Sequence, residues 1–150
     1  MTPGAASPTI ILRSVVEEDL GLFFEQQSDP DANAMAAFPA RGRREHLAHW
    51  HEILDDDTVI TRSIVYGEAV AGNIVSWIQD GKREVGYWIG RAFWGKGIAT
   101  SALRSFLDVD LQRPLFAWVA RHNAGSVRVL EKVGFVPAGE DGGYLIYRLG

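Results

Sequence analysis

The sequence lacks cysteine altogether, which excludes disulfide bonds, thiolate metal sites and a cysteine nucleophile. It also lacks any apolar run close to the roughly 18 residues that a membrane-spanning helix needs. The start of the chain, residues 1–8, has neither a basic region nor a long apolar core, and so does not resemble a secretory signal. We therefore expect a cytoplasmic protein with no membrane partner, in which residues 1–8 form a flexible tail.

Net charge is low and negative, at −4 over 150 residues, which argues against a general nucleic-acid-binding protein. The charges are unevenly distributed along the chain. From Lys82 to Lys132 there are nine Lys and Arg residues and four Asp and Glu residues, whereas the rest has six basic and fifteen acidic residues. Such a basic segment in an acidic protein suits a small polyanionic ligand, although a chance scatter of exposed charges gives the same count.

Turn residues and apolar periodicity divide residues 9–150 into helices and strands of a single predicted domain. The predicted strands are Thr9–Val15, Thr58–Tyr66, Ala69–Ile78, Lys82–Ile89 and Leu115–Ala120, followed by a closing hairpin over Val136–Gly150. The predicted helices are Glu17–Gln27, Glu45–Leu54, Ile98–Leu111 and a last one from the capping residue Asn123 to Val133, with a loop over Asp29–Arg44. Consecutive hairpins in the middle of this order predict an α+β fold with a mixed sheet, and not a doubly wound parallel one.

A glycine-rich turn, Trp94-Gly95-Lys96-Gly97, separates a predicted strand from a predicted helix. The first backbone N–H groups of a helix have no acceptor within the helix and lie at the positive end of its dipole. Gly95 and Gly97 have no Cβ, so an anion can approach the backbone closely. The turn therefore predicts a binding site for a phosphate group.

Two other interpretations of nearby residues are weaker. The segment Gly90–Gly97 comes close to the P-loop pattern, but Gly97 takes the place of the hydroxyl residue that binds Mg²⁺, and bulky Phe93 and Trp94 lie inside the loop. A nucleotide-binding protein is therefore a remote alternative. The second predicted helix carries three histidines, His46, His49 and His51. Because they do not share one helical face and lack carboxylate partners, we predict no metal site.

Two segments resemble motifs of the GNAT superfamily of N-acetyltransferases. Trp94–Thr100 is similar to the pyrophosphate loop Q/R-x-x-G-x-G/A, with Gly97 at the glycine and Ala99 at the last small residue. A tryptophan at the first place departs from that pattern and resembles the RimJ/RimL-type branch, W-G-x-G-I/Y-A-T. The second segment, Asn123–Phe135, is similar to N-x-x-S-x-x-V-x-E-K-x-G-F of the same branch.

The resemblance implies a GNAT fold over residues 9–150, with a mixed, mostly antiparallel twisted sheet of six to seven strands flanked by about four helices. It implies acetyl-CoA as co-substrate and no metal. The glycine turn would bind the pyrophosphate, the strand before it would pair with the pantetheine amides, and an N–H near Ile89 would stabilise the oxyanion. The implied cofactor-binding residues are Ile89, Trp94, Gly95, Lys96, Gly97, Ile98, Ala99, Thr100, Asn123 and Ser126.

Two residues are candidates for the chemistry of transfer. An amine acceptor is usually protonated and must lose a proton before it attacks. Glu84, on the strand that leads to the cofactor site, could accept that proton directly or through water, or could be an exposed strand charge without a role. Many GNAT enzymes have a tyrosine acid seven residues after the capping asparagine, where this chain has Leu130. Ser126 is the nearest hydroxyl to interact with the leaving thiolate, and Tyr144 and Tyr147 are outside candidates.

The resemblance implies that the acceptor is a primary amine, of a small molecule or of a peptide N-terminus, and the sequence does not identify it further. Residues expected to bind the acceptor are Phe38, Arg41, Trp50 and Trp88, and Arg43 is expected to line the pocket together with Arg41. With no cysteine to form an acyl-enzyme, we expect direct transfer in a ternary complex. A non-catalytic acyl-CoA-binding or sensor domain is the alternative, and the sequence allows a monomer or a homodimer.

Overall fold

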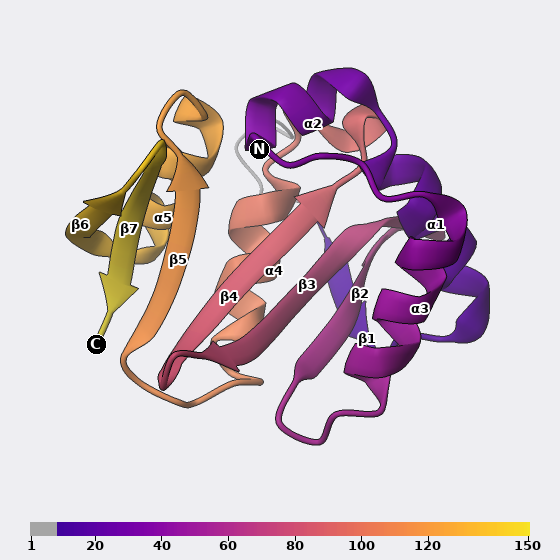
Figure 1. Cartoon of the computed structure of the whole chain (residues 1–150), viewed down its shortest axis with the longest axis horizontal. Coiled ribbons are helices and arrows are strands. Elements are labelled where there is room, and N and C mark those ends of the chain that lie inside the picture. The colour runs from indigo at the N-terminus through magenta and orange to yellow at the C-terminus, as the bar shows by residue number, and fades with distance from the viewer. Residues whose placement is uncertain (1–8) are drawn as a thin grey trace, which may run out of the picture.

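A computed structural model describes residues 9–150 of the chain, and the predicted tail at 1–8 lies outside them. Seven strands form one sheet in the order β1-β2-β3-β4-β5-β7-β6 (Figure 1). All neighbouring strands are antiparallel except β4 and β5, which confirms the predicted α+β fold with a mixed, mostly antiparallel sheet. The strands are β1 (Ile10–Arg13), β2 (Ile60–Tyr66), β3 (Ala69–Gln79), β4 (Lys82–Ile89), β5 (Leu115–Ala120), β6 (Val136–Asp141) and β7 (Tyr144–Leu149).

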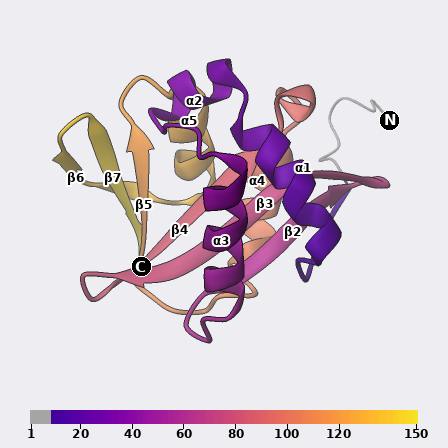
Figure 2. The same ribbon diagram turned by 45° about the vertical axis from the view of Figure 1, so that its right-hand side comes forward.

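Helices cover both faces of the sheet, with α1 and α3 on one face and α4 and α5 on the other (Figures 1 and 2). None of the helices in residues 9–150 is both long and apolar enough to cross a bilayer. The helices are α1 (Glu17–Gln27), α2 (Pro30–Ala36), α3 (Arg43–Leu54), α4 (Ile98–Phe106) and α5 (Ala124–Val133), with a short 3-10 turn, η2 (Arg91–Phe93), before the glycine turn.

Helix α2 is the main departure from the predicted elements, because Asp29–Arg44 was expected to be a loop. The side chain of Asp29 accepts a hydrogen bond from the N–H of Asp31 at 3.0 Å, and Pro30 occupies the first turn. Both are favourable N-terminal features of a helix. The helix ends at Ala36, and the capping residue Ala37 adopts a left-handed φ of 52°. Seven residues are too few to show a helical apolar period.

Two apolar cores hold the layers together. The larger lies between the sheet and α4 and α5, and α4 contributes Ile98, Ala102, Leu103 and Phe106 from one helical face. The smaller lies under α1 and α3, where the rings of Phe23 and Trp50 are 4.8 Å apart between centroids. The sheet is therefore buried on both faces along its central strands.

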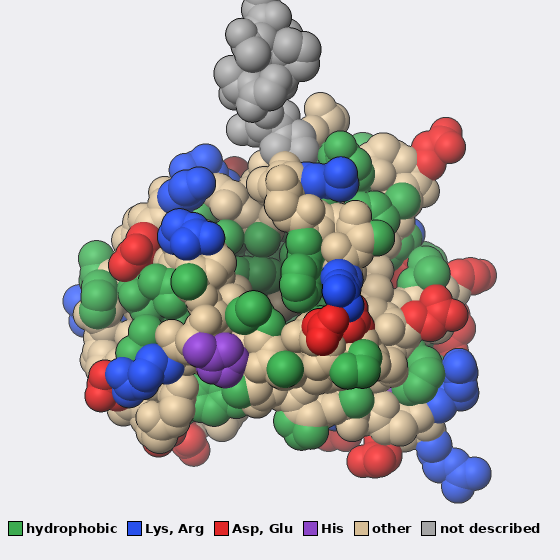
Figure 3. Space-filling model, turned by 90° about the horizontal axis from the view of Figure 1, so that it is seen from above, with side chains coloured by type: hydrophobic (Ala, Val, Ile, Leu, Met, Phe, Trp, Pro, Cys, Tyr) green, Lys and Arg blue, Asp and Glu red, His purple; other side chains and the backbone are tan. Residues whose placement is uncertain are grey.

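Strands β4 and β5 separate soon after they begin. They pair only at Arg83 with Leu115 and at Glu84 with Phe116, and they diverge toward the top of Figure 1. Seen from that end, the molecule is hollowed, with hydrophobic side chains in the hollow and Lys and Arg side chains on its rim (Figure 3). The edge of β4 that faces β5 therefore has no strand partner beyond Glu84.

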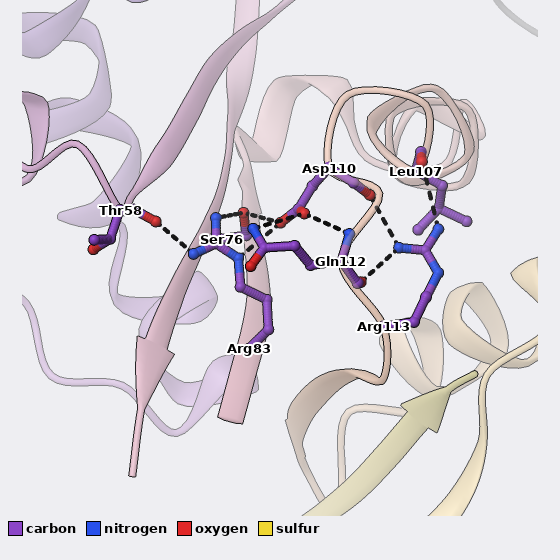
Figure 4. A network of polar contacts seen from close by, with 7 residues as sticks. All are labelled: Thr58, Ser76, Arg83, Leu107, Asp110, Gln112 and Arg113. Carbon is purple, nitrogen blue, oxygen red and sulfur yellow. Dashed lines mark hydrogen bonds and ion pairs between the residues drawn. The ribbon is translucent and has the colours of Figure 1, made fainter. Parts of the chain in front are cut away.

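A buried polar network fixes the closed end of this split (Figure 4). Arg83 donates hydrogen bonds to Asp110 and to Ser76, both at 2.9 Å, and Ser76 donates to the same Asp110 oxygen at 2.6 Å. A further bond from Arg83 reaches the carbonyl of Thr58. Burial alone would raise the pKa of Asp110, but the hydrogen bonds from Ser76 and Arg83 outweigh it and hold that pKa below its ordinary value. The network thus joins β3, β4 and the segment after α4.

We expect Asp110→Ala to lower stability strongly, because it leaves the Arg83 guanidinium buried without its anion. Loss of one partner from a buried ion pair costs about 3–5 kcal/mol, which denaturant unfolding would report as a lower midpoint. The control is Arg121→Ala, which breaks the exposed ion pair between Arg121 and Glu140 and should leave the midpoint unchanged. Equal midpoints for Asp110→Ala and the parent protein would contradict a structural role for the network.

Candidate active site

A cavity of about 610 Å³ lies where β4 ends and the first turns of α4 and α5 meet, and α2 forms part of its wall. Its basic lining residues are His122, Arg128 and Lys132. Among residues 9–150, no Asp or Glu lines it. The cavity therefore suits a polyanion. The basic pair Arg128 and Lys132 was missed at the sequence level, although their spacing of four residues on a predicted helix places them on one face.

The glycine turn forms one wall of this cavity. Gly95 and Gly97 both have a φ of 76°, a left-handed conformation that favours glycine. Gly97 is the N-cap of α4 and offers no side chain to the helix. No acceptor within the described part of the chain binds the N–H groups of Ile98, Ala99 and Thr100, and all three residues line the cavity. These N–H groups are therefore available to an anion in the cavity.

Trp94 ties the turn to the strand before it. Its indole Nε1 donates a hydrogen bond to the carbonyl of Ile89 at 2.9 Å. Both residues line the cavity, whereas the exposed Lys96 does not. The Trp94 indole therefore fixes the glycine turn against the end of β4.

Asn123 and Ser126 lie at the start of α5, on the opposite wall. The Asn123 side chain accepts a hydrogen bond from the N–H of Ser126 at 3.2 Å, as its predicted capping role requires. The hydroxyl of Tyr87, on β4, donates to Oγ of Ser126 at 2.9 Å. Burial raises the pKa of Tyr87, and the bond to Ser126 opposes this only in part. Tyr87 was missed from sequence, because an aromatic residue in a strand has the same pattern as a core residue.

A smaller cavity of about 110 Å³ continues between β4 and β5. It shares four lining residues with the larger cavity, Ala36, Tyr87, Asn123 and Ser126. No charged residue of the described chain lines it, and Leu130 contributes to its apolar wall. The Tyr87–Ser126 pair therefore lies where the two cavities meet.

Glu84 lies at the closed end of the split, opposite Phe116, with 8% of its surface exposed. It lines neither cavity, and it is three residues from Tyr87, about 10 Å along the strand and on the other sheet face. Its carboxylate has no hydrogen bond or ion pair with any residue of 9–150. Burial, together with the negative charge of Asp80, raises the pKa of Glu84 above its ordinary value, against the effect of Lys82.

Three of the four predicted acceptor-binding residues form a stack beside the larger cavity. Trp88 lines the cavity, its ring lies 6.1 Å from that of Phe38, and the Arg41 guanidinium lies 5.1 Å above the Phe38 ring. The fourth, Trp50, departs from the prediction. It is 5% exposed and packs on Phe23 in the smaller core, because α3 turns this face toward the sheet.

The three histidines of α3 do not converge. His46 is buried, and burial followed by the nearby charge of Arg41 lowers its pKa to about 4, whereas His51 pairs with Glu17 at the surface, at 2.8 Å. No group of three or more His, Cys, Asp or Glu side chains between residues 9 and 150 is arranged to hold a metal ion. The outside candidates Tyr144 and Tyr147 line neither cavity.

Comparison with known proteins identifies the family. Residues 9–136 match the model of the Acetyltransferase (GNAT) domain, so the chain belongs to the GNAT family of acetyltransferases. It is 33% identical over 136 residues to the Probable N-acetyltransferase YjcK of Bacillus subtilis (strain 168), an alignment that covers 79% of this chain and 74% of that protein.

Solved structures agree on the fold. An acetyltransferase from Thermus thermophilus superposes with a TM-score of 0.80 at 18% identity, covering 94% of this chain and 97% of that one. A spermidine N-acetyltransferase from Vibrio cholerae, solved with CoA and spermine, gives a TM-score of 0.78 at 18% identity, covering 93% and 92%. The predicted GNAT fold is therefore confirmed.

Proposed function

We propose that this protein is an N-acetyltransferase of the RimJ/RimL-like branch, which moves an acetyl group from acetyl-CoA directly to a primary amine in a ternary complex. The observation that carries the proposal is the set of free N–H groups at the start of α4, which line a cavity with basic and no acidic side chains. Membership of the GNAT family supports acetyl transfer.

The site fits acetyl-CoA in charge and in hydrogen-bonding groups. The N–H groups of Ile98, Ala99 and Thr100 would bind the pyrophosphate, and Arg128 and Lys132 would balance its remaining charge. The edge of β4 left unpaired by β5 would bond the amides of the pantetheine arm, as an added strand does. No step in this proposal needs a metal.

The thioester supplies an activated acetyl carbonyl. In the transfer, the amine nitrogen bonds to the carbonyl carbon, the carbon–sulphur bond breaks with its electron pair on sulphur, and the amine gives up a proton. The smaller cavity meets the larger one at Tyr87 and Ser126, between β4 and β5. Its lining is uncharged, which favours a neutral amine. Holding the two reactants together there supplies much of the rate enhancement.

Glu84 is proposed as the base that removes the amine proton. Only 8% of its surface is exposed, and its raised pKa makes it a better proton acceptor than an ordinary glutamate. Because it lies about 10 Å along the strand from Tyr87, transfer would pass through water.

The experiment for the cofactor site is Gly97→Glu. It adds bulk and negative charge where phosphate should bind, and calorimetry should show acetyl-CoA binding weakened at least tenfold, about 1.4 kcal/mol. The matched control is Gly142→Glu, because Gly142 also has a left-handed φ, of 58°, but lies in the β6–β7 turn. Unchanged affinity in a folded Gly97→Glu protein would refute the assignment.

For the base, we expect Glu84→Gln to lower kcat by about 10²–10⁴-fold while acetyl-CoA affinity stays nearly constant. The parent enzyme should lose kcat/KM as the pH falls through a pKa above 4.5, the ordinary value for Glu. Glu68→Gln, in the β2–β3 turn, serves as the control. Full kcat for Glu84→Gln across that pH range would place the base elsewhere.

For the acceptor site, we expect Arg41→Ala to raise the KM of the acceptor more than that of acetyl-CoA. Arg43 was expected to act with Arg41, but its guanidinium lies 4.4 Å above the Phe24 ring and not over Phe38, so Arg43→Ala serves as the matched control. A panel of polyamines, amino sugars, amino acids and peptides would show which amines turn over, and Arg41 predicts a carboxylate or other negative charge near the acceptor amine. Tight CoA binding with no turnover on any amine would instead favour a sensor domain.

A further inference from the structure

The last turn of α1 bonds both ends of the stack formed by Arg41, Phe38 and Trp88. The carbonyl of Gln26 accepts a hydrogen bond from the Trp88 indole Nε1 at 3.0 Å. The side-chain amide of the next residue, Gln27, bonds both backbone polar groups of Arg41. Two adjacent residues of one helix therefore connect the stack to the body of the protein.

The Gln27 amide pairs with the Arg41 backbone as a neighbouring strand would. Its Oε1 accepts from the Arg41 N–H at 2.8 Å, and its Nε2 donates to the Arg41 carbonyl at 3.1 Å. These partners fix the orientation of the amide, because a backbone N–H can only donate and a carbonyl can only accept. Nε2 also donates to the carbonyl of Phe24 at 3.1 Å, within α1. Gln27 is 7% exposed, so water competes little for these bonds.

The segment from Pro39 to Arg41 has little other support. It belongs to no helix or strand, and the two bonds to Gln27 are its only hydrogen bonds with residues 9–150. Phe38 and the two residues after it are exposed, so no apolar core holds them. The position of the Arg41 guanidinium, 5.1 Å above the Phe38 ring, therefore depends on Gln27.

We propose that Gln27 is a positioning residue for the acceptor site, which holds the Arg41 backbone so that the site selects amines that carry a carboxylate and an aromatic ring. The inference rests on the proposed function. Gln27 lines neither cavity, so it acts through Arg41 and not on the reactants.

The chemistry of the stack indicates this class of acceptor. Trp88 lines the larger cavity and its ring lies 6.1 Å from that of Phe38, so an aromatic ring of the acceptor has apolar surfaces to pack against. A guanidinium held in one place can form two parallel bonds to a carboxylate. No Asp or Glu of the described chain lines the larger cavity to bind a second ammonium group. An aromatic amino acid therefore fits better than a polyamine.

The test compares phenylalanine with phenethylamine, which share the amine and the ring and differ in the carboxylate. With acetyl-CoA as donor, we expect the parent protein to have the higher kcat/KM for phenylalanine. Gln27→Met keeps an unbranched side chain but cannot bond Arg41, and should lower the phenylalanine to phenethylamine ratio of kcat/KM about tenfold. This decrease should lie in the KM of phenylalanine, while the KM of acetyl-CoA and kcat for phenethylamine stay nearly constant.

A double variant separates positioning of Arg41 from a general effect of Gln27. Arg41→Ala should lower the same ratio, and adding Gln27→Met should lower it no further, because both changes act through one guanidinium. In the protein without ligand, NMR should show faster hydrogen exchange of the Arg41 N–H in Gln27→Met. Gln27→Asn, whose amide is one methylene shorter, should behave in the same way and serves if Gln27→Met does not fold.

The matched control is Ser63→Ala, which removes another buried hydrogen bond to α1. The Ser63 hydroxyl donates to Asp19 at 2.6 Å, in the first turn of the helix and about 12 Å along it from Gln27. Ser63→Ala should lower the midpoint of unfolding without changing the phenylalanine to phenethylamine ratio. An equal decrease of that ratio in Ser63→Ala and Gln27→Met would leave Gln27 with only a structural role and overturn the inference.

The other outcomes distinguish this inference from the proposed function. If Gln27→Met keeps the parent ratio, or if the parent protein acetylates the two amines equally well, the inference is overturned and acetyl transfer is untouched. Turnover of polyamines or amino sugars, but of neither phenylalanine nor phenethylamine, also overturns it. If CoA binds and no amine is acetylated, the proposed function itself fails.

Discussion

The two-residue pairing between β4 and β5 is the constraint on which the site depends. The strands are held together at Arg83 and Glu84 and nowhere beyond, and the buried contacts among Arg83, Asp110 and Ser76 secure that end. Beyond Glu84, the edge of β4 that faces β5 is free, and the smaller cavity lies between the two strands. A longer ladder would consume the backbone groups that a cofactor arm needs and would close the route between the cavities.

Turn residues, strand alternation and helix caps predicted the elements whose conformation depends on residues close together in the sequence. Hairpin turns and alternating strands predicted the pairing of β2 with β3 and of β3 with β4, whereas the pairing of β1 with β2 and of β4 with β5 follows from the structure. The glycine turn was found because left-handed backbone at Gly95 and Gly97 favours one residue type. Asn123 was found because a capping side chain has a fixed relation to the helix that it begins.

Tertiary contacts, which no local pattern encodes, decide where several side chains near the site lie. Trp50 was expected beside the acceptor, but the rotation of α3 directs it into the core. Tyr87 has an ordinary strand pattern, and only the approach of α5 gives its hydroxyl a partner. Glu84 lies on the predicted strand, but its distance from the cavities follows from where the ladder ends, which no local pattern encodes.

The way α2 is attached has a consequence for how such a protein can change its acceptor over evolutionary time. Only Ala32 of this helix is buried. The rest is held by peripheral bonds from three separate elements, among them Tyr144 to the carbonyl of Ala37 at 2.6 Å and His122 to that of Ala34 at 2.8 Å. Substitutions along its exposed face therefore cost little folding free energy, so the wall of the cavity can diversify while the anion-binding turn and the buried ion pair stay the same.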